Sequence, residues 1–159
     1  MNIFILDEDP LLAAHYQCNR HIVKMTLETA QILCTVHHKA GMTAPYRPTH
    51  KNHPCVIWAG ECAMNYYWLL KHGIGLSREY TRRYGKIHKS GDVMLSLDTP
   101  DLPFNNGSMT PFALAVPECY RGDDPVESYR SYYIHEKGSI AEWPDGLVPP
   151  WWPIPKLLG

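Results

Sequence analysis

Titratable side chains recur within one short stretch of the sequence, residues 18–31 (CNRHIVKMTLETAQ). The set comprises Arg20, His21, Lys24 and Glu28. Histidine and glutamate are common proton-transfer groups near neutral pH. A lysine flanked by other cationic side chains can have a lowered pKa and then act as a nucleophile. The stretch therefore has the residue types of a catalytic site, with His21 and Glu28 as acid and base and Lys24 as a candidate nucleophile.

Helical periodicity places these polar side chains on one face. At 100° per residue they fall within an arc of about 100°. The opposite face carries apolar side chains such as Val23, Leu27 and Leu33. Two interpretations remain open. Either the polar face is exposed to water, with Lys24 and Glu28 as an ordinary i,i+4 ion pair, or it forms one wall of an active-site cleft.

A second segment, residues 71–89, carries six basic residues and one acidic residue, interleaved with tyrosines. Its candidate DNA contacts are Arg78, Arg82, Arg83, Lys86 and Lys89. Arginine and lysine neutralise phosphates, and tyrosine can stack on bases or donate a hydrogen bond. The alternative is a solvated helix end whose cations interact with the C-terminal dipole.

The loop at residues 41–54 contains His50 and His53, a His-x-x-His pair beside Cys55. Such a pair can bind a metal, but no CxxC or HExxH motif accompanies it. A structural or surface role is the alternative. We expect neither a metal site nor a cofactor, and His50 and His53 are the residues that a metal analysis would test.

Tryptophans and prolines fill the C-terminal stretch, residues 142–156 (EWPDGLVPPWWPIPK). The proline content predicts an extended tail instead of a helix. Trp151 and Trp152 either pack this tail onto the helices or stack on bases. Both residues are therefore candidate DNA contacts.

Composition bounds the class of protein. The chain has 159 residues, a net charge of −1 and five cysteines without a CxxC pair. These values predict a single domain over residues 1–159 in a reducing compartment. We expect a cytoplasmic protein, because no apolar run is long enough for a bilayer and no basic stretch precedes the N-terminal apolar residues. The near-neutral total argues against indiscriminate nucleic-acid binding but permits one basic face.

Local signals predict a mainly α, compact helical bundle with long ordered loops and an extended aromatic C-terminal tail. Asp9-Pro10 can start a long helix that ends near Gly41, with a possible interruption. A second helix is expected over residues 56–84, where Gly73 and Gly75 mark a break or a close approach. Residues 2–6 form a strand or a buried arm. Residues 90–123 are expected to be mostly irregular, and a short helix should occupy residues 124–137.

Three segments resemble the phage-type pyrimidine-dimer DNA glycosylase/AP lyase family, of the endonuclease V type. RHIVK, residues 20–24, is similar to a charged stretch on that family's first helix. HPCVIWAGECAMNYYWLLKHGIGLSREYTRRYGK, residues 53–86, resembles its central helix. VPPWWPIPK, residues 148–156, resembles its aromatic tail. Together the three segments cover just under a third of the chain.

The resemblance implies a mechanism. In that family the N-terminal α-amine attacks C1′ of the damaged nucleotide, a Schiff base forms, and β-elimination cuts the strand. α-Amines titrate near pH ~8, so many are neutral nucleophiles at pH 7. The family's catalytic carboxylate falls on His21 here, and Glu28 is the nearest acid on that face. Because Asn2 follows Met1, retention of Met1 is expected and the amine would belong to Met1.

The leading hypothesis is a DNA N-glycosylase or AP lyase that acts on damaged or modified pyrimidines in duplex DNA. Met1 is the expected nucleophile, with His21 and Glu28 as acid and base, and Lys24 is the next candidate nucleophile. Arg20 and Lys24 join the basic segment as candidate contacts to phosphate or nucleotide. The alternatives are an enzyme that modifies nucleotides or DNA bases, with a metal at His50 and His53, and a non-catalytic nucleic-acid-binding module.

Overall fold

Helices joined by long loops make up the structure, a computed structural model that describes residues 1–153. The α-helices are α1 (Pro10–His15), α2 (Asn19–Lys39), α3 (Pro54–Glu61), α4 (Ala63–Tyr84), α5 (Lys89–Leu95) and α6 (Pro125–Glu136), and two 3₁₀ turns span Asn105–Gly107 and Glu118–Tyr120. No strand occurs among residues 1–153, so the expected mainly α class is confirmed. The last part of the expected tail, residues 154–159, lies outside the described residues.

The first long helix is interrupted once, between α1 and α2. Asp9 caps α1 by accepting hydrogen bonds from the amides of Leu11 and Leu12, as the Asp-Pro pair predicts. The chain leaves the helix after His15, and α2 starts behind Cys18, which has extended backbone angles. The short turn lets α1 fold back onto α4, against which it packs.

The second long helix breaks at Cys62, whose φ of −157° and ψ of 163° are extended. The break therefore lies upstream of the two glycines that sequence periodicity singled out. Gly73, inside α4, instead lets α2 and α5 approach α4 closely. A Cβ at this position would lie 2.4 Å from the sulfur of Met94 in α5 and 2.8 Å from the side chain of Thr29 in α2. Gly85 ends α4 with φ 67°, a left-handed conformation that favours glycine.

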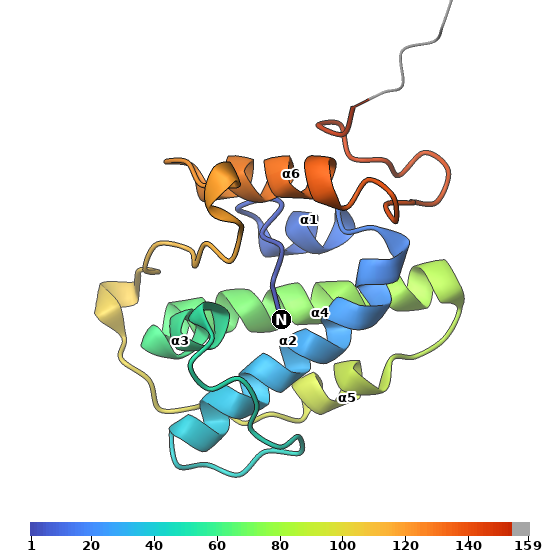
Figure 1. Cartoon of the computed structure of the whole chain (residues 1–159). Coiled ribbons are helices and arrows are strands. Elements are labelled where there is room, and N and C mark those ends of the chain that lie inside the picture. The colour runs from blue at the N-terminus through green and yellow to red at the C-terminus, as the bar shows by residue number, and fades with distance from the viewer. Residues whose placement is uncertain (154–159) are drawn as a thin grey trace, which may run out of the picture.

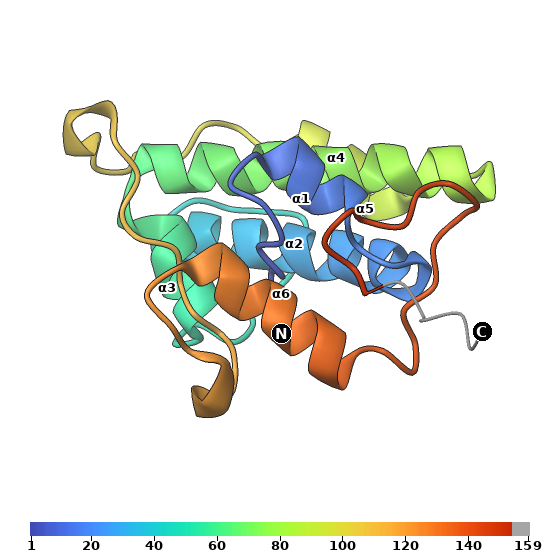
Figure 2. The same cartoon turned by 90° about the horizontal axis from the view of Figure 1, so that it is seen from above.

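Two further helices, α5 and α6, follow the long helices α2 and α4 in the chain. The segment expected to be irregular contains α5, which His88 caps through a hydrogen bond from Ser90 and which packs against both α2 and α4. Asp124 caps α6, as expected, by accepting from Val126 and Glu127. In Figure 2, α4, α2 and α6 follow one another down the view, whereas Figure 1 shows α6 above both of the long helices.

Residues 2–6 form a buried arm and not a strand, as one of the two predicted alternatives has it, although the arm turns at Phe4, where φ is 56°. The side chains of Ile3, Ile5 and Leu6 are fully buried. Figure 1 shows this arm descending from α1 so that the N-terminus lies near the middle of the view, beside α2. Because the arm belongs to the core, its first residues are held against the middle of α2.

Candidate functional site: a pocket at the N-terminus

A small cavity of about 150 Å³ lies where the N-terminal arm, α2 and the end of α6 meet. Its lining consists of Met1, Asn2, Phe4, His21, Lys24, Met25, Glu28, Tyr132 and Lys137. The four catalytic candidates from the sequence, Met1, His21, Lys24 and Glu28, are therefore gathered in one place. We call this cavity the N-terminal pocket.

Glu28 is the acidic group of the N-terminal pocket. Its Oε2 accepts a hydrogen bond of 3.2 Å from the backbone nitrogen of Asn2, and its Oε1 lies 3.8 Å from Nζ of Lys24. The Glu28 side chain is only 14% exposed, whereas that of Lys24 is 68% exposed. The carboxylate is thus fixed beside the first residues of the chain, and the lysine covers it from the solvent side.

Asn2 holds the start of the arm in place. Its side-chain amide donates to the carbonyl of Ala115 over 2.8 Å. Its Oδ1 accepts from the amides of Ile3 and Phe4. These bonds form a tight turn in which Phe4 has φ 56°, a conformation that is rare for a bulky residue. The position of the N-terminus is therefore set by several hydrogen bonds.

His21 lies in the wall of the pocket and is 5% exposed. Its Nδ1 is 2.8 Å from the hydroxyl of Tyr133, which also accepts a 2.8 Å hydrogen bond from the amide of Cys18. The imidazole stacks on Phe4 with 4.5 Å between ring centroids. Burial, together with the charges of Lys137 and Lys24, lowers the pKa of His21 to about 4. The ring is therefore neutral at pH 7.

A lysine and an aromatic ring from the C-terminal part of the chain complete the pocket. Nζ of Lys137 lies 5.8 Å from the ring centroid of Phe4 and 5.2 Å from that of Tyr132. At these distances an ammonium is attracted to the ring faces. The pocket therefore has a cationic aromatic side in addition to the carboxylate of Glu28.

His53 lies near the N-terminus, whereas His50 is exposed. Nδ1 of His53 accepts the amide hydrogen of Cys55 and caps α3. Burial, followed by the nearby N-terminal charge, lowers the pKa of His53. Within residues 1–153, no three His, Cys, Asp or Glu side chains lie close enough to hold a metal ion. His53 thus has a capping role in this structure.

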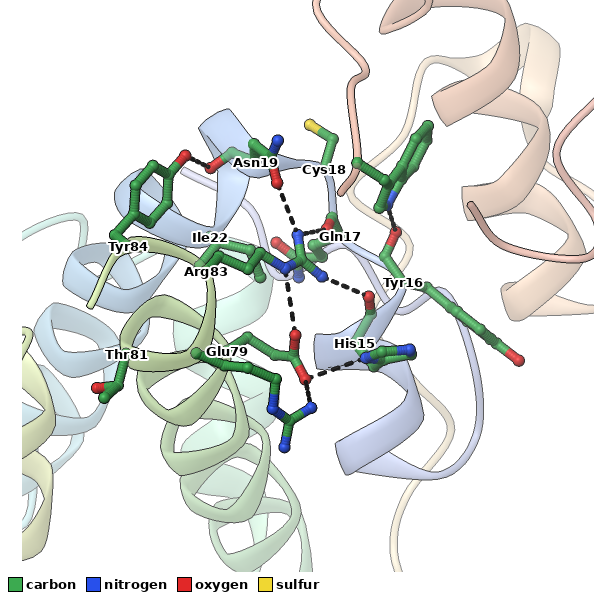
Figure 3. Close-up of polar contacts among 12 residues, drawn as sticks. His15, Tyr16, Gln17, Cys18, Asn19, Ile22, Glu79, Thr81, Arg83 and Tyr84 are labelled. Carbon is green, nitrogen blue, oxygen red and sulfur yellow. Dashed lines mark hydrogen bonds and ion pairs between the residues drawn. The ribbon is translucent and has the colours of Figure 1, made fainter. Parts of the chain in front are cut away.

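Arg83 is buried in a polar network that joins α4 to the turn between α1 and α2 (Figure 3). Its guanidinium donates to the carbonyls of His15 and Gln17, each over 2.8 Å. It also pairs with Glu79 at 3.2 Å, and the Arg83 side chain is 2% exposed. Arg83 was a candidate DNA contact in the sequence, but these bonds occupy its guanidinium and direct it into the protein.

The other basic candidates are exposed. Arg20 and Lys24 lie on the first turns of α2. Two contacts bring the α4–α5 connection, which carries Lys86 and Lys89, to the same end: the Tyr84 hydroxyl bonds to Asn19, and His88 to Val23. Arg78 and Arg82 lie farther away, in a groove between α1 and α4. Four of the basic candidates therefore gather at one end of the bundle and two lie on another side.

The two tail tryptophans pack onto the helices. The Trp151 ring lies 5.9 Å from Tyr16 and 5.2 Å from the guanidinium of Arg130. Trp152 lies 6.2 Å from Tyr133 and 4.9 Å from Trp143. Both are partly exposed, so packing against the helices is their main contact in this structure.

Sequence reasoning missed the pocket residues Asn2, Phe4, Tyr132 and Lys137. No local pattern marks them, because they lie on the arm and at the end of α6, and only the tertiary fold brings them to α2. One available signal was an asparagine and a phenylalanine within an otherwise aliphatic run, NIFIL. Polar and bulky residues there suggest that the arm does more than fill the core.

Comparison with known proteins gives one match. A family model described as pyrimidine dimer DNA glycosylase matches residues 1–91, which is more than half of the chain. The match includes the arm, α2 and α4, and ends before α6. No curated protein and no solved structure matches the chain. No helix within residues 1–153 is long and apolar enough to cross a membrane.

Proposed function

This chain belongs to the pyrimidine dimer DNA glycosylase family, and from that premise we propose that it excises a damaged or modified pyrimidine and then cuts the strand through a Schiff base on its N-terminal amine. Membership in this family supports a role in DNA repair with DNA as the substrate. The observation that carries the finer proposal is the 3.2 Å contact between the nitrogen of Asn2 and the carboxylate of Glu28. This contact supports Glu28 as the acid/base group, because its carboxylate lies beside the first residues of the chain.

The nucleophile in this proposal is the α-amine of Met1, which lines the pocket with Glu28. The neutral amine attacks C1′, and the bond from C1′ to the base breaks with its electron pair on the base. Glu28 accepts the surplus proton of the new C1′–N bond and returns it to O4′ as the sugar ring opens. A protonated imine, the Schiff base, then joins the protein to C1′.

Strand cleavage follows by β-elimination. Glu28, again a carboxylate, removes a proton from C2′, and the electron pair forms a C1′–C2′–C3′ conjugated system as the 3′ phosphate leaves. The protonated imine accepts the developing charge, so no metal is required for this step. Water then hydrolyses the imine and frees the amine.

Lys24 is the alternative nucleophile. Its Nζ lies 3.8 Å from Glu28 in an ion pair, and an ammonium in such a pair must first lose its proton to attack. Its side chain is also 68% exposed, so it lacks the burial that activates catalytic lysines. This geometry favours a role for Lys24 in holding a phosphate or Glu28.

Phosphate contacts are assigned to the exposed cations at the end of the bundle next to the pocket. Arg20, Lys24, Lys86 and Lys89 form this set. Arg78 and Arg82, which line a groove beside α1 on another side, would contact the backbone farther along the duplex. Arg83 is left out because its guanidinium is bound inside the protein. A basic area beside the pocket would hold the backbone on either side of the extruded nucleotide.

Borohydride trapping tests the proposal. Labelled duplexes with a thymine dimer, an abasic site, uracil or no lesion are incubated with the protein, and borohydride is added. We expect a covalent complex with the abasic and dimer strands, and peptide mapping should locate the adduct on residue 1 instead of Lys24. If no lesion yields an adduct or a cut strand, the Schiff-base proposal is wrong.

A further inference from the structure

We propose that His21, Lys137 and the rings of Phe4 and Tyr132 form a seat for the departing pyrimidine base within the N-terminal pocket. This inference rests on the proposed function, because it assigns the part of the same site that handles the leaving group. His21 donates a hydrogen bond to the base as it leaves, and Tyr133 is a positioning residue that fixes the orientation of that donor.

The hydrogen bonds of Tyr133 determine which nitrogen of His21 carries the proton. The hydroxyl accepts the amide hydrogen of Cys18 at 2.8 Å and lies 2.8 Å from Nδ1 of His21. Tyr133 is fully buried, so leaving its own O–H without an acceptor would cost roughly 1–3 kcal/mol. Nδ1 is a stronger acceptor than the thiol of Cys18, which also lies beside this hydroxyl, so that proton is given to Nδ1. The neutral imidazole must then carry its hydrogen on Nε2, which has no partner among the hydrogen bonds of the described residues.

The imidazole of His21 stays neutral at the near-neutral pH at which a repair enzyme works. The pKa of His21 is lowered to about 4, first by burial and then by Lys137 and Lys24. A neutral N–H donor cannot give up its proton easily, but it can stabilise a developing anion by a hydrogen bond. His21 is therefore suited to stabilising the leaving group, and Glu28 remains the group that moves protons.

Lys137 and the two rings supply the rest of the seat. The ammonium lies within 6 Å of the ring centroids of both Phe4 and Tyr132, and these two rings are 6.1 Å apart. Aromatic faces can stack on a base, and the ammonium offers a positive charge to a base that departs as an anion. Phe4 is held at φ 56°. Strained positions of this kind cluster at ligand-binding and active sites.

The size of the pocket agrees with a single ring. Its volume is about 150 Å³, and a cavity of about 150 Å³ in a protein core can hold one benzene molecule. One pyrimidine ring is of that class, whereas a purine is larger. In a linked dimer, the seat would take only the ring whose glycosidic bond breaks.

When the C1′–N1 bond breaks, its electron pair passes to N1 and is delocalised onto O2 of the pyrimidine. O2 accepts the hydrogen bond from Nε2–H of His21, and the nearby ammonium of Lys137 compensates the negative charge. The base takes its proton from water after it leaves. An abasic substrate has no base, so its cleavage does not use the seat.

The ratio of two activities in the same protein tests this assignment. The first is base release, measured as breakage of the glycosidic bond because a ring of a thymine dimer stays joined to its neighbour, in duplexes that carry a thymine dimer, uracil, 5-hydroxymethyluracil or thymine glycol. The second is strand cleavage at a preformed abasic site. For His21→Phe and Lys137→Met we expect base release to fall by about 10²-fold, the typical cost of one donor to a developing anion. Abasic cleavage should fall far less than base release, because no base departs in that reaction, so the ratio of the two activities changes.

Two further variants separate chemistry from folding. His21→Gln keeps an N–H donor near the same position and should retain more base release than His21→Phe. Tyr133→Phe should also lower base release selectively, because His21 loses the group that sets its tautomer. The matched controls are His135→Phe and Lys51→Met, which change exposed residues of the same types, and we expect both activities to be unchanged.

The outcomes distinguish the two proposals. Equal loss of both activities in His21→Phe and Lys137→Met, or no loss of either, would overturn the seat and leave the Schiff-base proposal intact. Abasic cleavage without release of any base in the panel would also overturn it. If the unchanged protein neither cleaves abasic DNA nor releases a base, the proposed function fails and the seat fails with it.

Discussion

The carboxylate of Glu28 accepts a 3.2 Å hydrogen bond from the backbone nitrogen of Asn2, although 26 residues separate the two in sequence. This contact joins the middle of α2 to the start of the chain. It gives the polar face of α2 a specific neighbour and accounts for a carboxylate at a site that is only 14% exposed. Most of the proposed chemistry depends on this pair.

Replacement of Glu28 by glutamine should abolish proton transfer while preserving the fold. The amide oxygen of glutamine can still accept from Asn2, so we expect the melting temperature to change little. Strand cleavage at an abasic site should fall by about 10²–10⁴-fold, the usual contribution of a general acid or base. Cleavage is measured under single-turnover conditions. Glu127→Gln, on the exposed face of α6, should behave as the unchanged protein, and similar rates for both variants would remove Glu28 from the mechanism.

The start of the chain should be equally sensitive. A short peptide added ahead of Met1 moves the α-amine away from Glu28, and we expect trapping to fall by at least about 10²-fold because the reacting atoms are misplaced. DNA binding, measured by fluorescence anisotropy, should remain. The same peptide at the C-terminus is the control. A chain that starts at Asn2 should still be trapped, because its amine would be the atom that now lies 3.2 Å from Glu28; loss of trapping there would assign the nucleophile to Met1 alone.

The sequence was informative where a property is local. Asp9 and Asp124 each precede a proline and cap their helices as expected, and Gly85 ends α4. Helical spacing also grouped His21, Lys24 and Glu28. Helical spacing cannot show which other segment packs against a given face of the helix. The N-terminal arm covers part of the polar face, so His21 is buried, whereas Val23 on the apolar face is 41% exposed.

The consecutive residues Arg82 and Arg83 also show that spacing does not reveal which side chain another segment covers. Both are arginines in the last turn of α4, and both fit a phosphate-binding pattern equally well. In the structure their side chains are 64% and 2% exposed. The difference arises because α1 and the turn after it lie over one side of α4, and their carbonyls accept from Arg83. That covering segment is 60 or more residues away in sequence, so no pattern around Arg83 indicates it.

Arg83 should therefore matter for stability. In Arg83→Met, Glu79 would lose its buried partner, and the carbonyls of His15 and Gln17 would lose their donor. Breaking a buried ion pair typically costs about 3–5 kcal/mol, which a urea titration at pH 7.5 would measure. Arg82→Met, which removes an exposed partner of the same glutamate, should cost less than about 1 kcal/mol. Equal losses in the two variants would contradict this division of roles.

The exposed cations should instead determine the salt dependence of DNA binding. Lys86→Met and Lys89→Met each remove one proposed phosphate contact, so the slope of log K against log salt should decrease by about 1 per variant. Melting temperatures should be unchanged because both side chains are exposed. Lys51→Met, on the loop between α2 and α3, serves as a control of equal charge. If the slope of log K against log salt for Lys86→Met and Lys89→Met equals that for Lys51→Met, these two lysines are not phosphate contacts and DNA binds to another surface.

Stability should decrease in mild acid because two buried histidines are held neutral. The pKa values of His21 and His72 are lowered from 6.5 to about 4, in each case first by burial. Between these values the unfolded chain binds protons that the folded chain does not. The contribution of the two neutral histidines to the free energy of unfolding is therefore fully present above pH 6.5. It is lost as the pH falls toward about 4 and changes no further below that pH.

Each of these histidines would contribute on the order of 3 kcal/mol to that loss. Urea titrations at pH 7.5, 6 and 5 would measure it. His72 donates from Nδ1 to the carbonyl of Pro10 and lies 3.2 Å from the amide of Gln17, so His72→Gln should be less stable at pH 7.5. It should nevertheless lose less stability on acidification, because the group that takes up the proton is gone. His135→Gln, at an exposed position, should keep the full acid sensitivity, and an equal slope in both variants would mean that carboxylates, and not the buried imidazoles, cause it.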